Sequence, residues 1–286
     1  MEQKFINLFD RYTHGGMSRR DFLDKLTLMA GSTAAAAAVL PILENNYARA
    51  EMVPANSPDL LIQDGEIAPG ITGHLAIPKA ATGKLPAVLV IHENRGLNPH
   101  IKDVTRRMAL EGFVAFGADY LAPLGGTPAD EELAREMIGK LGRKEAVSYS
   151  TRAIAALMTH PQSTAKAGAM GFCWGGGQVN ALAVEDPDLA AGVAYYGSQP
   201  KAEDVPRITA PLMLHYAGLN ERINAGIADY EKALKAAGKS YELFMYEGAN
   251  HAFNNDSNTA RYNKEAADLA WGRTVAFLKQ HGGGTA

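Results

Sequence analysis

Short apolar runs alternate with longer amphipathic stretches along the chain from residue 70 onward. The apolar runs predict strands at residues 71–77, 87–92, 114–119, 166–170, 191–196, 212–216 and 241–246. Most of them are apolar at successive positions, which is typical of strands buried on both faces of a parallel sheet. The amphipathic stretches predict helices at residues 101–111, 131–140, 144–160, 176–184, 227–237 and 262–279. This alternation predicts an α/β fold with a mostly parallel central sheet flanked by helices.

Composition and charge limit the class of protein. With 286 residues and 47% hydrophobic content, the chain can bury one large core, and single α/β domains of this size are common. A net charge of −3 gives no electrostatic footprint for nucleic acid or an anionic membrane surface. The single cysteine excludes an intrachain disulfide framework. We therefore expect one α/β domain over residues 51–286, with no nucleic-acid partner.

The first fifty residues differ in kind from the rest and resemble an export signal. Residues 18–23 read Ser-Arg-Arg-Asp-Phe-Leu, which resembles the twin-arginine pattern, although Asp24 stands where that pattern often has lysine. An alanine-rich apolar stretch follows over residues 26–43, and Ala48-Arg49-Ala50 has the A-x-A form of a cleavage site. These features predict that residues 1–50 address the chain to the twin-arginine export machinery. After cleavage behind Ala50, the protein is expected to be periplasmic or secreted, without stable membrane insertion.

An alternative interpretation keeps this N-terminal segment in the finished protein. Its apolar stretch also suits a helix that packs on the body of the protein, or one that anchors the chain to a membrane. The sequence leaves both possibilities open beside cleavage.

A glycine-flanked cysteine follows the predicted strand at 166–170 and precedes the predicted helix at 176–184. The sequence there is Gly171-Phe172-Cys173-Trp174-Gly175, which matches the G-x-S-x-G nucleophile elbow with sulfur in place of oxygen. In such an elbow the chain turns sharply from strand to helix, and the glycines tolerate the crowding around the central side chain. Cys173 is therefore a candidate nucleophile. Alternatively, it is a small buried apolar residue in an unreactive turn.

Later strands are followed by a polar turn and a histidine, in the order that the α/β-hydrolase fold requires: nucleophile, acid, histidine. His251 lies in a loop after the last predicted strand and is the candidate general base. A surface histidine in a turn is the alternative. The turn after the strand at 212–216 holds Asn220 and Glu221, where the acid is expected.

Three motifs together resemble the dienelactone hydrolase (carboxymethylenebutenolidase-like) family, α/β-hydrolases that open lactones and esters with a cysteine nucleophile. They are Gly-Phe-Cys-Trp-Gly-Gly-Gly at 171–177, Ile-His-Glu-Asn-Arg-Gly at 91–96 and Asn-His-Ala-Phe at 250–253. The resemblance extends over residues 75–278. It implies a small ester or lactone as substrate and no metal or organic cofactor.

The resemblance assigns further roles around Cys173. In family members the glutamate matching Glu93 contacts the nucleophile in the resting enzyme, which implies a thiol that stays protonated until substrate disturbs the contact. A helix N-terminal carboxylate is the alternative role for Glu93. The backbone N–H groups of Asn94 and Trp174 are expected to form the oxyanion hole. The side chain of Trp174 fits either a core or a pocket position.

The third member of the triad departs from the family, because the family's aspartate matches Asn220. An amide cannot carry the negative charge that stabilises an imidazolium, and its presence is severely damaging in serine triads. A thiol is far more acidic than a hydroxyl, so an asparagine can suffice to orient His251, as in Cys-His-Asn proteases. Two alternatives remain. Glu221 replaces the acid after a shift of one residue, or the site is weakened or non-catalytic and binds a ligand.

Family members hold a substrate carboxylate with arginines, one of them shortly after the histidine, where this chain has Asn255. Arg95, Arg135 and Arg222 are candidates to compensate, although surface arginines are common. This departure weakens the case for dienelactone itself. The expected substrate class is a small ester, lactone or thioester.

Overall fold

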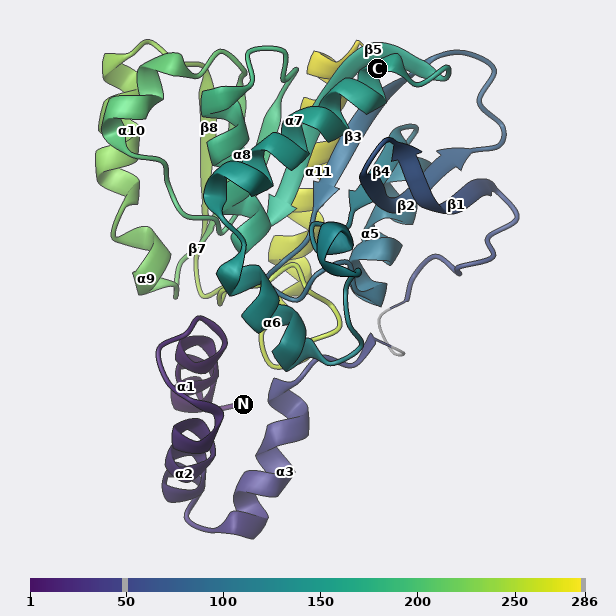
Figure 1. The fold of residues 1–286 in the computed structure, drawn as a ribbon. Coiled ribbons are helices and arrows are strands. Elements are labelled where there is room, and N and C mark those ends of the chain that lie inside the picture. Colours follow the sequence, from purple (N-terminus) through teal and green to yellow (C-terminus); the bar gives the residue numbers. More distant parts are fainter. Residues whose placement is uncertain (48–50, 284–286) are drawn as a thin grey trace.

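An eight-stranded sheet forms the centre of the computed structural model, which describes residues 1–47 and 51–283 (Figure 1). The strands are β1 (Leu60–Ala68), β2 (Ile71–Pro78), β3 (Leu85–Ile91), β4 (Val114–Ala118), β5 (Ser163–Phe172), β6 (Gly192–Tyr195), β7 (Leu212–Ala217) and β8 (Tyr241–Tyr246). Their order in the sheet is β1-β2-β4-β3-β5-β6-β7-β8. The pairs β1–β2 and β2–β4 are antiparallel, and all other neighbouring pairs are parallel.

Helices cover both faces of this sheet (Figure 1). They are α5 (Pro99–Leu110), α6 (Glu131–Lys140), α7 (Arg143–Thr159), α8 (Trp174–Glu185), α9 (Glu221–Asn224), α10 (Ile227–Ala236) and α11 (Lys264–Gly282). Residues of α7, α8 and α10 share one hydrophobic core with the sheet, and residues of α5 and α11 share the other. The predicted fold class, a mostly parallel sheet flanked by helices, is confirmed.

The seven predicted strands are present as β2 to β8, whereas β1 is not among them. The sequence of β1 is Leu-Leu-Ile-Gln-Asp-Gly-Glu-Ile-Ala, in which polar residues follow apolar ones without regular alternation. β1 lies at the edge of the sheet, and every residue after Leu60 is exposed or half-buried. Because so few of its side chains are buried, β1 lacks the longer apolar run that marks the buried strands.

Three further helices precede the sheet: α1 (Gln3–Thr13), α2 (Arg19–Ala30) and α3 (Thr33–Leu43). They pack on one another around a small apolar core that includes Phe9, Phe22 and Leu26. Figure 1 shows this N-terminal helical segment, residues 3–43, next to α6 and α9. The segment lies at the edge of the sheet formed by the carboxyl ends of the parallel strands. In open α/β sheets, ligand-binding sites form at this edge.

The apolar stretch at residues 26–43 is divided between α2 and α3. Gly31 caps α2 with a φ of 84°, in the left-handed region that glycine favours. Together the two helices have the length and composition of a membrane span, but they are bent by 115° at the break; no single helix in the described residues is long and apolar enough to cross a membrane. Arg19 and Arg20 are exposed in the first turn of α2. The cleavage site predicted at residues 48–50 lies outside the described residues.

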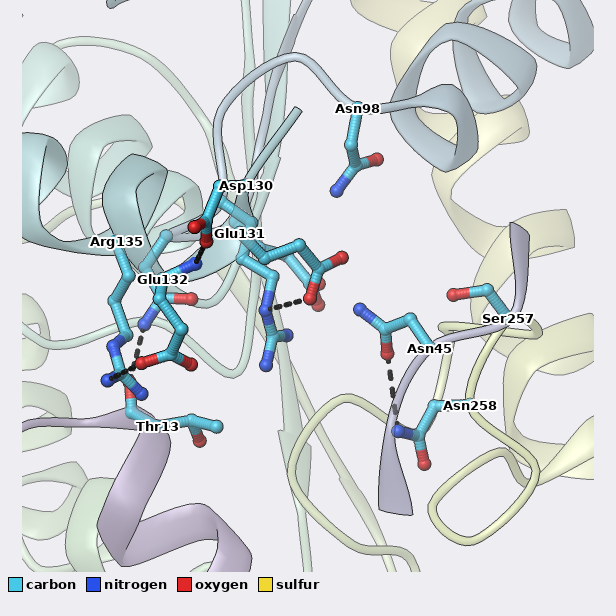
Figure 2. Close-up of polar contacts among 12 residues, drawn as sticks. Thr13, Asn45, Asn98, Asp130, Glu131, Glu132, Arg135, Ser257 and Asn258 are labelled. Atoms are coloured by element: carbon cyan, nitrogen blue, oxygen red, sulfur yellow. Dashed lines mark hydrogen bonds and ion pairs between the residues drawn. The ribbon is translucent and has the colours of Figure 1, made fainter. Parts of the chain in front are cut away.

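Polar contacts fix the chain after α3 against the loop that follows His251. Nδ2 of Asn258 donates to the carbonyl oxygen of Leu43 at 2.6 Å and to Oδ1 of Asn45 at 3.2 Å. Figure 2 shows Asn45 and Asn258 facing each other. The N–H of Asn46 donates to a carbonyl oxygen of the same loop at 2.7 Å. Hydrogen bonds thus join the C-terminal end of the N-terminal helical segment to the α/β domain.

Candidate active site

The strand β5 ends in a sharp turn into α8. Cys173 occupies this turn with φ 56° and ψ −112°, a strained backbone conformation for a residue other than glycine. The flanking glycines allow the turn, because a Cβ atom on Gly171 would lie 2.3 Å from the carbonyl oxygen of Gly175. A Cβ atom on Gly175 would lie 2.4 Å from the carbonyl oxygen of Ile91. The thiol is therefore carried on a strand-to-helix elbow at the N-terminal end of α8.

His251 and Asn220 contact each other beside the elbow. His251 lies in the loop after β8, and Asn220 lies between β7 and α9. Nδ1 of His251 is 2.7 Å from the side-chain nitrogen of Asn220, and both residues are buried. Glu221 is exposed in the first turn of α9. The structure thus brings Asn220, rather than Glu221, to the histidine.

The second ring nitrogen of His251, Nε2, is buried and has no hydrogen-bond partner among the described residues. Burial lowers the pKa of His251 well below its usual value, and this outweighs the opposing effect of the Asp10 carboxylate. The positive charges of Arg222 and Arg261 lower the pKa further. His251 is therefore neutral at neutral pH, which is the charge state of a general base.

A second histidine reaches the thiol from the N-terminal helical segment. His14 directly follows α1, and its Nε2 lies 3.2 Å from Sγ of Cys173. Its Nδ1 lies 2.7 Å from the carbonyl oxygen of Asp10 and 3.2 Å from the carboxylate oxygen Oδ1 of the same residue. Because both Asp10 atoms are acceptors, Nδ1 carries a proton, and Nε2 faces the sulfur. The rings of His14 and His251 meet edge to face, with their centroids 4.7 Å apart.

His14 differs from His251 in charge. Burial by itself would lower the pKa of His14, but the negative charges of Cys173 and Asp10 and the hydrogen bonds to both raise it to about 9. Burial would raise the pKa of the Asp10 carboxyl, but the hydrogen bond with His14 and the charges of His14 and Arg222 lower it. At neutral pH the site therefore holds a protonated His14 next to the thiol and a neutral His251.

Neither Asp10 nor His14 is indicated by the sequence motifs. A signal for them exists, because apolar residues recur at helical spacing from Phe5 to Tyr12 and are buried, as in a helix that packs on a protein. Asp10 and His14 are four residues apart, which places them on one helix face. The interpretation of residues 1–50 as an export signal sets this pattern aside.

Glu93 is buried just after β3. Among the described residues, its Oε2 accepts a hydrogen bond from Nδ2 of Asn255 at 2.9 Å, whereas the hydrogen bond of the Cys173 thiol is with His14. Asn255, at the position where the resemblance implies an arginine, therefore holds Glu93. The thiol contact that the resemblance implies for Glu93 is occupied by His14.

The two residues expected to supply the oxyanion donors, Asn94 and Trp174, come from the turn after β3 and from the start of α8. Trp174 is the first residue of α8, so its N–H has no acceptor within the helix. Asn94 lies in the turn after β3, and its side chain donates to the carbonyl oxygen of Thr13 at 2.8 Å. The ring of Trp174 stacks on His92, with centroids 5.3 Å apart. Trp174 and Asn94 both line the same pocket as Cys173.

A pocket of about 580 Å³ lies over Cys173 and is lined by residues of α6, α9 and the end of α1. Its volume suits a small organic molecule. Of the three candidate arginines, Arg135 and Arg222 line it. Arg95 is buried outside this lining, and its Nε lies 2.9 Å from Oε2 of Glu131. Figure 2 shows Glu131 and Arg135 on α6.

Both pocket arginines contact the N-terminal helical segment. Nη1 of Arg135 donates to the carbonyl oxygen of Tyr12 at 3.2 Å, and its guanidinium lies over the Tyr12 ring, 4.3 Å from the centroid. Nε of Arg222 lies 3.6 Å from Oδ2 of Asp10. Arg261, which no motif indicates, is buried and lines a neighbouring cavity of about 400 Å³ beside the same segment. A substrate carboxylate would compete with these contacts for the arginines.

The side chains of His14, Cys173 and His251 bring three donor atoms within 4.8 Å of one another. Imidazole nitrogen and thiolate sulfur are also ligands of Zn²⁺ in proteins. The hydrogen bond between His14 and Cys173 accounts for the approach of these two side chains without an ion.

Known proteins resemble two parts of this chain. Residues 71–282 match a family model described as the dienelactone hydrolase family, and residues 1–31 match one described as YqhI-like. A Methylorubrum extorquens protein provisionally named a carboxymethylenebutenolidase is 32% identical over 236 residues, covering 77% of this chain and 79% of that protein. A Bradyrhizobium protein provisionally named a 2-oxo-3-(5-oxofuran-2-ylidene)propanoate lactonase is 32% identical over 222 residues, covering 73% of this chain and 88% of that protein.

A solved structure agrees with these sequence matches. The crystal structure of a Klebsiella pneumoniae protein, provisionally described as a dienelactone hydrolase, matches with a TM-score of 0.69 at 28% identity, covering 77% of this chain and 99% of that chain. The family match begins at residue 71, after the N-terminal helical segment. On the strength of its match over residues 71–282, the chain belongs to the dienelactone hydrolase family.

Proposed function

We propose that the protein hydrolyses small carboxylic esters or lactones through an acyl-enzyme on Cys173, with His251 as general base. One observation carries this proposal: a thiol on a strained elbow, at the N-terminal end of α8, shares a pocket with a neutral, buried histidine held by Asn220. Membership of the dienelactone hydrolase family supports the class of reaction. The name of the Bradyrhizobium relative, a lactonase, supports lactones among the substrates.

The proposed reaction has two steps. The thiolate of Cys173 attacks the carbonyl carbon, a C–S bond forms, and the carbonyl oxygen takes negative charge beside the N–H groups of Asn94 and Trp174. The intermediate collapses, the C–O bond to the leaving alcohol breaks, and the alkoxide takes up the proton that the Cys173 thiol gave to a histidine of the site when the thiolate formed. His251 then accepts a proton from water, which attacks the thioester and expels the thiolate as the acid is released.

Asn220 is compatible with this chemistry because the nucleophile is a thiol. A serine hydroxyl needs a base that is oriented and stabilised by a carboxylate. A free cysteine, in contrast, ionises near a pH of about 8.5, and a positive neighbour favours the thiolate further. An amide that orients His251 therefore suffices.

A second candidate is a protein that binds a ligand in this pocket without turnover. The observation that favours it is the absence of a carboxylate at Asn220, whose amide contacts His251. Against it stands the retention of the elbow, the thiol and the histidine in one pocket.

Ester hydrolysis by the purified full-length protein separates the two candidates. We expect p-nitrophenyl acetate to give a burst of p-nitrophenol followed by slower turnover, and Cys173→Ala to abolish both. Cys173→Ser is the matched control for shape. Its hydroxyl needs a stronger base than the Asn220–His251 pair, so turnover should fall about 10³-fold or more. Binding of esters by the wild-type protein without turnover would favour the ligand-binding function.

We further propose, from the sequence pattern, that the protein is exported by the twin-arginine route. This route carries folded proteins, which suits a chain with a single cysteine that needs no disulfide in order to fold. The exposure of Arg19 and Arg20 in the first turn of α2 supports their access to a receptor. Cleavage after Ala50 stays a prediction, as does membrane anchoring in its place.

A further inference from the structure

The hydrogen bond to the thiol of Cys173 comes from the N-terminal helical segment. Nε2 of His14 lies 3.2 Å from Sγ, and Nδ1 of the same ring contacts the carbonyl oxygen and the carboxylate of Asp10. Nucleophile, imidazole and carboxylate thus stand in the order of a catalytic triad. This second arrangement contains the carboxylate that Asn220 does not provide.

We propose that His14 is a second catalytic histidine, which forms an ion pair with the thiolate of Cys173 and donates its proton to the leaving group, while His251 activates the attacking water. Asp10 is the positioning residue of His14. The inference rests on the proposed function, because it divides the proton transfers of that reaction between two histidines. It also requires that residues 1–50 stay with the working enzyme.

The charge states of the two histidines support this division. Acid and base roles are assigned where environments push the pKa values of two neighbouring groups apart. His14, with a pKa raised to about 9, is protonated at neutral pH, and His251, whose pKa is lowered by burial, is not. As the pH rises through about 9, His14 loses its proton, so the ion pair and the proton donor are lost together.

Several elements place charged or titratable groups around His14. They are Asp10 on α1, Cys173 at the elbow, His251 after β8, Arg135 and Glu136 on α6, and Arg222 on α9. Of these, the two that hydrogen bond the ring, Asp10 and Cys173, favour its protonated form.

The proton transfers balance over a complete cycle. In acylation the thiolate forms the C–S bond, the C–O bond breaks, and the leaving alkoxide takes the proton from Nε2 of His14. In deacylation His251 takes a proton from water, and the water oxygen forms a C–O bond to the acyl carbon. The C–S bond then breaks, which restores the thiolate and releases the acid. His251 then holds one proton more than at the start and His14 one fewer. The two rings are 4.7 Å apart edge to face, so a transfer between them, direct or through water, resets the site.

His14 is held in place by the loops that carry the rest of the site. Nε2 of Gln3 donates to Oδ1 of Asn250, the residue before the base, at 2.5 Å. Asn94, the expected oxyanion donor, binds the carbonyl oxygen of Thr13 at 2.8 Å, and Figure 2 shows Thr13 close to α6. Both ends of α1, the helix that His14 directly follows, are therefore hydrogen bonded to the loops of the site, which fixes the position of His14 as a catalytic side chain requires.

A comparison of leaving groups tests the proton-donor role. p-Nitrophenolate leaves without protonation, whereas ethoxide does not, so His14→Gln should lower kcat/KM about 100-fold on ethyl acetate but only about tenfold on p-nitrophenyl acetate. A purely structural role would lower both values equally. A blocking role would raise both. Either of these results would overturn the proposal.

Alkylation of the thiol tests the ion pair without any need for turnover. Because the thiolate is the reactive form, iodoacetamide should modify wild-type Cys173 about tenfold faster than His14→Gln at a pH of about 6.5, and this advantage should disappear above about pH 9. Equal rates at the lower pH would refute the ion pair, whether or not the protein hydrolyses esters. If hydrolysis is absent while the difference persists, the proposed function fails and the ion pair stands.

Asp10→Asn tests the positioning residue. Removing the carboxylate lets the pKa of His14 fall, so the loss of kcat/KM on ethyl acetate at high pH should begin about one pH unit lower than in the wild type. A purely structural defect would lower kcat/KM without shifting the pH at which it is lost, and this result would refute the role of Asp10. Two substitutions are matched controls: Asp21→Asn, exposed on α2, and His160→Gln, at the end of α7. They should change neither kcat/KM on ethyl acetate nor the pH at which it is lost.

Discussion

Asn220 decides which form of His251 the site contains. Its side-chain nitrogen lies 2.7 Å from Nδ1, and a donor there requires an unprotonated Nδ1, with the proton on Nε2. Half a turn about the Cβ–Cγ bond brings Oδ1 to the same place, where it accepts the Nδ1–H and leaves Nε2 as the base. An asparagine thus permits both tautomers, whereas an aspartate permits only the one with a basic Nε2.

We therefore expect Asn220→Asp to retain or raise activity. The carboxylate fixes the tautomer and raises the pKa of His251, so kcat near pH 8 should rise about three- to tenfold. Since His251 is a base only when unprotonated, activity should now be lost as the pH falls through this raised pKa, and the acidic limb should move to higher pH. A profile of kcat/KM between about pH 5 and 9 measures both effects. Glu221→Ala is the control and should change little; if it abolishes turnover while Asn220→Ala does not, Glu221 is the acid.

Motif spacing indicates only part of the site. Cys173, His251 and Asn220 each follow a parallel strand, and the ends of parallel strands meet at one edge of the sheet, so their order along the chain predicts their proximity. Asp10 and His14 lie outside this alternation. Their position depends on how the N-terminal helical segment docks, and that docking is a tertiary contact which no local pattern specifies.

At the scale of elements, the elbow depends on close contact between the start of α8 and the end of β3. We expect Gly175→Ala to lower the free energy of unfolding by about 3 kcal/mol or more, because a Cβ there would meet the carbonyl oxygens of Ile91 and His92 at 2.4 and 2.5 Å. Gly272→Ala in α11 is the matched control. No described atom lies within 4 Å of that Cβ, so the substitution should raise the free energy of unfolding by about 1 kcal/mol through helix propensity. Urea unfolding measures both, and equal effects would contradict this explanation of the elbow.

The buried elements follow from the sequence better than the others. β3 to β7 are buried along most of their length, so their apolar runs mark them directly. β1 has no such run, because its side chains after Leu60 are exposed or half-buried. The apolar stretch at residues 26–43 suits a signal, an anchor or a packed helix, and only its partners in the fold distinguish these.

At the scale of the whole molecule, the N-terminal helical segment has two competing roles, as an address for export and as a part of the site. If the twin-arginine route is used, Arg19→Lys together with Arg20→Lys should keep the protein in the cytoplasm, as cell fractionation would show. Because His14 belongs to the proposed site, we expect the exported, active protein to retain residues 1–50 when its intact mass is measured. An exported chain that begins at residue 51 and is fully active would contradict the role of His14.

The acyl-enzyme on Cys173 is tested most directly by intact-mass spectrometry of His251→Gln after brief incubation with p-nitrophenyl acetate. In this variant the thiolate still attacks, but no base activates water, so we predict that one acetyl group accumulates per chain and maps to Cys173. The same experiment on the double variant Cys173→Ala, His251→Gln should give no adduct. Wild-type turnover that persists in Cys173→Ala, or an acetyl group on another residue, would contradict an acyl-enzyme at the elbow.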